Sequence, residues 1–166
     1  ENSVNGGVNG FVFDNTARCE VVNNQVASAG RGFAVRTLRG TALAFNTARL
    51  CYEYGFYFGE SRGIVVDSNT AANNTGFGFY LEDSSDCLLT DNTASRDGYT
   101  GLEGGYTAVS CYNCTLEDNT ASNDKYYGFL LDHSFACRLY RNTAIEPTSN
   151  GFFLNCSQEC TLLSNT

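Results

Sequence analysis

Residues 78–94 read GFYLEDSSDCLLTDNTA, and residues 128–144 read GFLLDHSFACRLYRNTA. In both stretches an aromatic residue follows the glycine, a cysteine lies nine residues after it, and an Asn-Thr-Ala triplet begins fourteen residues after it. The same frame starts seven times, at Gly10, Gly32, Gly55, Gly78, Gly105, Gly128 and Gly151. A recurrence this strict indicates a protein built from short internal repeats.

The repeat length decides the architecture. Asn-Thr pairs begin at Asn46, Asn69, Asn92, Asn119, Asn142 and Asn165, so the steps are 23, 23, 27, 23 and 23 residues. Apolar residues alternate with a period of two within each unit, which predicts short half-buried strands and argues against helices. Three short strands and three turns in such a unit describe one coil of a parallel β-helix. Coils stack about 4.8 Å apart, so the sequence predicts an all-β rod of about seven coils of ~23 residues.

Alternation also predicts which side chains point inward. Phe56, Phe79 and Phe129 are expected to form one interior column, and Leu81 and Leu131 to lie in the next. The repeated asparagine is expected at a tight turn, in the left-handed conformation that Asn tolerates, with its amide bonded to the asparagines above and below. We therefore predict a structural ladder of Asn46, Asn69, Asn92, Asn119 and Asn142.

Cysteines also follow the repeat. Five of the eight share one inward column: Cys19, Cys87, Cys114, Cys137 and Cys160. Parallel side chains on adjacent coils fit disulfide torsion angles poorly, and buried cysteine packs well as a small apolar residue. We predict a stack of reduced thiols rather than disulfides. An apolar interior offers a soft metal no entry path, so no metal site and no cofactor are predicted.

Composition limits the remaining possibilities. With 166 residues and a net charge of −8, the chain is expected to form a single domain over residues 1–166 that repels nucleic acid. No apolar run approaches the ~20 residues of a membrane-spanning helix. Both ends align with the same phase of the repeat, which predicts either a slice of a longer solenoid or end-to-end stacking of copies. A stable monomer in light scattering would contradict the stacking hypothesis.

The units Gly78–Ala94 and Gly128–Ala144 resemble the right-handed parallel β-helix repeats of the pectate-lyase-like superfamily. They are most similar to the carbohydrate-binding and sugar-hydrolysis repeats, a group that includes the periplasmic accessory protein of nitrous-oxide reductase maturation. The resemblance implies a right-handed, single-stranded β-helix. It leaves function open, because lyases, hydrolases, epimerases, adhesins and passive spacers share these coils. Copper handling, implied by one relative, is disfavoured by the absence of Met and the single His.

Catalytic candidates are few. Glu82 and Asp132 project outward from the strand that begins at the glycine, and they lie two coils, about 10 Å, apart. This separation is just beyond that of inverting glycosidases and much wider than that of retaining ones. The single histidine, His133, follows Asp132. These residues are either catalytic or ordinary solvated surface groups, and the sequence favours the interpretation as surface groups.

Aromatic residues mark a candidate binding face. Tyr57 and Tyr80 point outward from the glycine strand, and Tyr126 and Tyr127 lie in the turn before it. The fourth coil alone carries four extra residues in that turn, where Tyr99 lies. Exposed tyrosines beside carboxylates suit stacking on sugar rings or contact with a protein.

The sequence favours a non-enzymatic, rigid rod outside the cell or on its surface. Its Tyr-rich face is predicted to bind polysaccharide or another copy of the chain. The alternative is a polysaccharide lyase, hydrolase or epimerase whose acids lie on the first-strand face and the fourth-coil loop.

Overall fold

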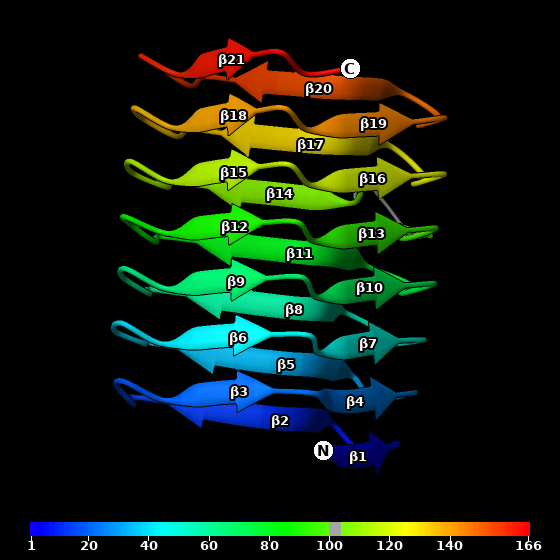
Figure 1. Ribbon diagram of the computed structural model, residues 1–166. Helices are drawn as coiled ribbons and strands as arrows, with labels where there is room; N and C mark the ends of the chain where they lie inside the picture. Colours follow the sequence, from blue (N-terminus) through cyan, green and yellow to red (C-terminus); the bar gives the residue numbers. More distant parts are fainter. Residues whose placement is uncertain (100–103) are drawn as a thin grey trace.

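The computed structural model describes residues 1–99 and 104–166, and it is a right-handed parallel β-helix (Figure 1). Coils stack from the N-terminus at one end of the rod to the C-terminus at the other. The described residues contain no helix, and so none that could span a membrane. Part of the fourth-coil insertion lies outside the described residues.

Each coil contributes one strand to each of three seven-stranded sheets. The first sheet holds the longest strands: β2 (Asn9–Asp14), β5 (Arg31–Arg36), β8 (Tyr54–Gly59), β11 (Phe77–Glu82), β14 (Tyr106–Val109), β17 (Tyr127–Asp132) and β20 (Asn150–Asn155). The second sheet comprises β3 (Glu20–Val22), β6 (Ala42–Ala44), β9 (Val65–Asp67), β12 (Leu88–Thr90), β15 (Thr115–Glu117), β18 (Arg138–Tyr140) and β21 (Thr161–Leu163). The third comprises β1 (Asn2–Asn5), β4 (Asn24–Ala27), β7 (Thr47–Arg49), β10 (Thr70–Ala72), β13 (Thr93–Ser95), β16 (Thr120–Ser122) and β19 (Thr143–Ile145).

Strand pairing keeps the sequence repeat in register. All the pairs are parallel, and residues one repeat apart lie side by side, as Phe56, Phe79 and Tyr106 do in the first sheet. The four-residue insertion between β13 and β14 does not shift this register, because β14 pairs with both β11 and β17 in the same frame. The insertion therefore does not interrupt the pairing of the sheets.

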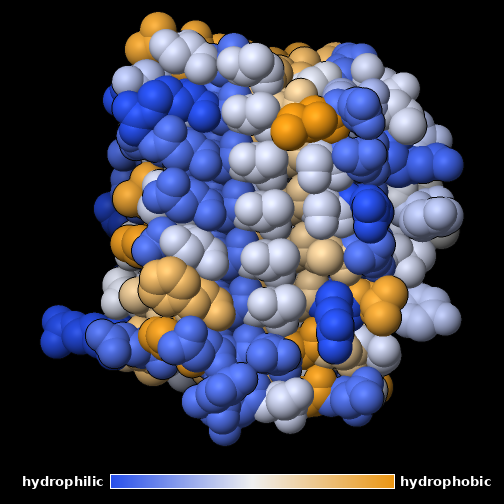
Figure 2. All heavy atoms as spheres, turned by 45° about the vertical axis from the view of Figure 1, so that its right-hand side comes forward, coloured by the Kyte–Doolittle hydropathy of each residue, from blue (hydrophilic) through white to orange (hydrophobic). Residues whose placement is uncertain are grey.

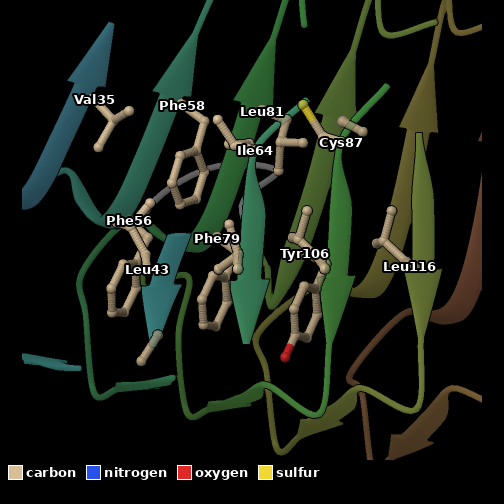
Figure 3. Packing of buried hydrophobic residues seen from close by; sticks show 14 of the residues in the cluster. Val35, Leu43, Phe56, Phe58, Ile64, Phe79, Leu81, Cys87, Tyr106 and Leu116 are labelled. Carbon is tan, nitrogen blue, oxygen red and sulfur yellow. The ribbon is translucent and has the colours of Figure 1, made fainter. Parts of the chain in front are cut away.

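The interior consists of stacked side chains, as the alternation predicts. The rings of Phe33, Phe56, Phe79, Tyr106 and Phe129 lie nearly parallel, with centroids 4.7–4.9 Å apart, and three of them are visible in Figure 3. All five are fully buried. This spacing equals the separation of neighbouring parallel strands, so each coil places its ring directly against the next.

The predicted asparagine ladder is present. In each step, Oδ1 of one asparagine accepts hydrogen bonds from both the backbone N–H and the side-chain amide of the asparagine one coil earlier. Asn69 donates both bonds to Asn92, at 2.9 and 3.0 Å, and Asn92 donates both to Asn119, at 3.0 Å each. The ladder also extends beyond the five predicted residues, to Asn24 and Asn165.

The left-handed conformation predicted for the ladder asparagines is wrong. The left-handed residue of this turn is the one immediately before each asparagine, with φ between 53° and 57°. These residues are Asn23, Phe45, Ser68, Asp91, Asp118, Arg141 and Ser164. The following asparagine is not among the residues of positive φ, and from Asn24 to Asn142 its side chain is buried in the rod.

The eight cysteines form no disulfide in this structure. Cys87, Cys114 and Cys137 are buried, as expected for the inward column, whereas Cys19 and Cys160 are partly exposed. Their thiols donate to backbone carbonyls, as Cys87 Sγ does to Ser85 O at 3.2 Å. The redox state of the column in the protein's own compartment stays a prediction.

Candidate functional site

The outer face of the first sheet carries three rows of side chains that run along the rod. Strand register aligns Tyr54 with Phe77 in one row and Tyr57 with Tyr80 in the next. In the third row Glu82 pairs with Val109, which pairs with Asp132. The predicted two-coil separation of Glu82 and Asp132 is therefore confirmed. Figure 2 shows a neighbouring side of the rod, where side chains of similar hydropathy also form columns along the stack.

Four aromatic side chains gather on β8 and β11, and we call this group the aromatic cluster: Tyr54, Tyr57, Phe77 and Tyr80. Tyr54 and Phe77 stack at 5.6 Å, and Tyr57 and Tyr80 stack at 6.0 Å. Across the rows, Phe77 and Tyr80 are tilted with centroids 4.7 Å apart. Tyr54 and Phe77 are the first residues of β8 and β11, and they share the outer face with Tyr57 and Tyr80.

Charged groups border the aromatic cluster. The guanidinium carbons of Arg31 and Arg36 lie 5.8 Å from the Tyr54 ring centroid and 5.5 Å from the Tyr57 centroid, respectively. On the other side, the Tyr57 hydroxyl donates to Glu82 Oε2 at 3.0 Å. Burial raises the pKa of Tyr80 to about 12, and the nearby Glu82 carboxylate adds to this shift. Both hydroxyls therefore stay protonated at neutral pH.

Tyr57 lies beneath the surface of this cluster. Only 6% of it is exposed, although it points outward as the alternation predicts. Its hydroxyl lies over Gly59, where a Cβ would come 2.4 Å from the oxygen. Tyr57 thus supports its neighbours, while Tyr54, Phe77 and Tyr80 are half-buried and offer their rings to solvent.

The turns that lead into β14 and β17 hold Tyr99 and Tyr126, whereas Tyr127, which the sequence placed in the turn, is the first residue of β17. Tyr99 is 74% exposed, and Lys125 Nζ lies 5.6 Å from the centroid of its ring. Both line a hollow of about 290 Å³, together with Asn73, Arg96, Asp97, Asn123 and Thr148. Tyr126 and Tyr127 are half-buried, with centroids 6.4 Å apart. Cations, amides and an aromatic ring thus meet beside the outer face.

Asp132 and His133 form a separate pair at the end of β17. His133 Nδ1 lies 2.8 Å from Asp132 Oδ1, and the Asn155 amide donates to the same oxygen at 2.8 Å. The imidazole is 61% exposed and takes the left-handed conformation, with φ 48°. The carboxylate therefore holds Nδ1 of a ring that is otherwise open to solvent.

Metal ligation finds no support in the donor groups. Nowhere in residues 1–99 and 104–166 do three His, Cys, Asp or Glu side chains converge to hold an ion. The buried cysteines donate to backbone carbonyls instead. The described residues therefore do not fit a resident copper or other metal ion.

Comparison with known proteins shows which family this fold belongs to. The family model of the right-handed beta helix region matches residues 1–105. The chain belongs to the right-handed β-helix family. A second model, the periplasmic copper-binding protein NosD, matches residues 100–166. No curated protein matches the sequence.

Solved structures show the same coil architecture at low sequence identity. A mutant of the periplasmic alginate epimerase AlgG superimposes with a TM-score of 0.78 at 16% identity, over 98% of this chain and 48% of that one. The A-module of the Azotobacter vinelandii mannuronan C-5 epimerase AlgE4 gives 0.74 at 18% identity, over 88% and 41%. The tailspike protein gp49 of Pseudomonas phage LKA1 gives 0.67 at 13% identity, over 97% and 30%. The chain thus spans half or less of each of these proteins.

Proposed function

We propose that this β-helix is a rigid polysaccharide-binding rod located outside the cytoplasm. The observation that carries the proposal is the aromatic cluster on β8 and β11, bordered by Arg31, Arg36 and Glu82. Apolar sugar faces stack on such rings, while arginine and carboxylate groups bind hydroxyls and acidic substituents. The alginate and mannuronan epimerases support the same ligand class by likeness of fold, and the periplasmic matches support the location.

A rigid platform suits this ligand. The rings are held by strand pairing and by one another, and Tyr57 is fastened beneath them by its hydrogen bond to Glu82. Little side-chain freedom is therefore lost on binding, which favours affinity. The hollow beside Tyr99 and Lys125 lies on turns adjoining the same sheet, and it supplies a second contact region for a long chain.

Replacing Tyr80 by Ala is expected to weaken binding to the preferred polysaccharide about tenfold, since loss of one stacking ring removes about 1.4 kcal/mol. Affinity electrophoresis or calorimetry against alginate, polygalacturonate and a neutral glucan measures the effect. Tyr112→Ala is the matched control, because Tyr112 is 55% exposed but lies away from the outer face, stacked on Phe135. Equal binding by the two variants would contradict the proposal. The absence of binding to all three polymers would contradict it as well.

The alternative function is a polysaccharide epimerase, lyase or hydrolase, and the observation that favours it is the Asp132–His133 pair held by Asn155. Under the proposed binding function, incubation with polymannuronate in deuterated water should produce neither C5 exchange nor unsaturated or reducing ends. Turnover that is abolished in His133→Gln and Asp132→Asn would establish an enzyme instead. Glu82 is a weaker candidate, because its carboxylate is already bonded to Tyr57.

Association with further copies of the chain remains part of the hypothesis. Light scattering of the purified chain distinguishes a monomer from end-to-end assemblies. Binding through the aromatic cluster is independent of this outcome, since the cluster lies on the side of the rod rather than at its ends.

A further inference from the structure

A second, shorter ladder runs parallel to the asparagine ladder, five residues further along each coil. Cys51 N–H donates to Asn74 Oδ1 at 2.9 Å, and Asn74 N–H donates to Asp97 Oδ1 at 2.7 Å. Asp97 N–H then donates to Asp124 Oδ1 at 2.8 Å. The Asn74 amide also donates to Asp97 Oδ1, at 3.0 Å. These bonds repeat the pattern of the asparagine ladder, in which Oδ1 accepts two bonds from the preceding coil.

The second ladder differs from the asparagine ladder in one atom of the side chain. Where an asparagine has a donating amide nitrogen, Asp97 and Asp124 each have a carboxylate oxygen, Oδ2. Both residues are 1% exposed, and among the described residues neither Oδ2 has a hydrogen-bond partner. The two oxygens point at the interior, since a Cβ on Gly78 or Gly105 would come 2.6 or 2.5 Å from them.

Two buried, unsolvated carboxylates on neighbouring coils cannot both carry a charge at low cost. We propose that Asp97 and Asp124 share a proton in the folded protein. The proton resides on Asp97 Oδ2, which then donates to Asp124 Oδ1 as a ladder amide would. Coils four and five are thereby joined by a bond that depends on pH.

The groups around Asp97 and Asp124 provide no positive charge that would neutralise the two carboxylates. Asn74 offers only a neutral amide, and the Tyr106 hydroxyl donates to Thr120 O at 3.3 Å. Among the ion pairs of the described residues, none joins Arg96 or Lys125 to either carboxylate. The Cys51 thiol, whose pKa burial raises to about 11, is neutral, and the next coil offers Pro147 and the exposed Glu146. A proton is therefore the available neutralising group, and Asp97 borders the hollow beside Tyr99, through which it can exchange.

The direction of the pH effect follows from linkage. Burial raises the pKa of Asp124 to about 7, and burial together with Asp124 raises the pKa of Asp97 well above its ordinary value. A raised pKa means that the folded state holds more protons than the unfolded state above about pH 4. The part of this stabilisation due to Asp124 is complete below about pH 4 and is lost as the pH rises through about 7. The part due to Asp97 is lost as the pH rises through the raised pKa of that carboxyl.

Asp97→Asn tests the proposal, because an asparagine amide completes the ladder without a proton. Between pH 5 and pH 8 we expect the melting temperature of the natural protein to fall by about 5 °C or more. In Asp97→Asn this fall should be largely absent, and the variant should melt higher than the natural protein at pH 8. Asp91→Asn, which removes an exposed carboxylate from the same coil, should keep the natural pH profile.

A direct readout avoids dependence on the folding of the variant. In the natural protein labelled with ¹³C at the aspartate carboxyl carbons, two resonances should titrate above pH 5, and both should change or vanish in Asp97→Asn. If every carboxyl carbon titrates below pH 5, or if Asp97→Asn keeps the natural pH profile of melting, the shared proton is disproved.

Discussion

Replacing Asn92 by Ala is expected to lower the free energy of unfolding by about 3–5 kcal/mol. The substitution leaves the buried N–H of Asn69 without its acceptor at 2.9 Å, and the carbonyl of Val66 without its donor at 2.8 Å. It also removes the amide contact to Asn119. Each buried group left without a partner costs about 1–3 kcal/mol. Urea unfolding followed by circular dichroism measures the change.

The neighbouring Thr93→Ala is the control for this substitution. Thr93 lies beside Asn92 in the same coil, but it is partly exposed. We expect a loss below about 1 kcal/mol, because no buried polar group loses its partner. A similar loss in both variants would mean that strand propensity, and not the ladder, explains the effect.

An aspartate at the same position connects the two ladders. In Asn92→Asp, the new oxygen would face Val66 O and Asn119 Oδ1, both of which are acceptors. Stability should then fall as the pH rises, for the same reason as at Asp97. The two ladders thus have one chemistry, and they differ in whether the donor is a permanent amide hydrogen or an exchangeable proton.

Much of the fold could be predicted from the sequence, because every coil repeats the same residues at the same positions. The phenylalanine column, the three-strand coil and the asparagine ladder each follow from a residue type that recurs. The left-handed position before each asparagine could not be found in this way. Phe45, Asp91 and Arg141 occupy it in different coils, so composition gives no signal there.

The candidate site was less predictable, because it depends on neighbours from several coils. Tyr57 follows the predicted direction, but Arg36, Tyr80 and Glu82 cover it. Asp97 and Asp124 gave no signal, since Cys51, Asn74 and Pro147 occupy the same position in other coils. A comparison of the residues five after each ladder asparagine would have revealed two adjacent acids pointing inward.

Replacing Gly128 by Ala is expected to destabilise the rod by about 2–3 kcal/mol, although alanine is only one methyl group larger. A Cβ at this position would come 2.8 Å from Ala144 Cβ and 2.8 Å from Gly151 O. The second contact is with the backbone of the next coil, which cannot move without stretching the pairing of β17 and β20. The repeated glycine is thus required by the close approach of stacked coils.

Gly63→Asn is the matched control, and thermal or urea unfolding of both variants decides the point. Gly63 has φ +62° and nothing within 4 Å of its would-be Cβ, and the residues that follow it in its column, Asp86 and Asn113, adopt the same conformation. Asparagine tolerates this left-handed backbone conformation, so the free energy of unfolding of Gly63→Asn should differ from that of the natural protein by less than about 1 kcal/mol.

If Gly128→Ala were equally mild, coils could separate locally at little cost. The rigidity proposed for the binding face would then lack its physical basis, because the same stacked glycines hold β8 and β11 at the spacing of the aromatic cluster.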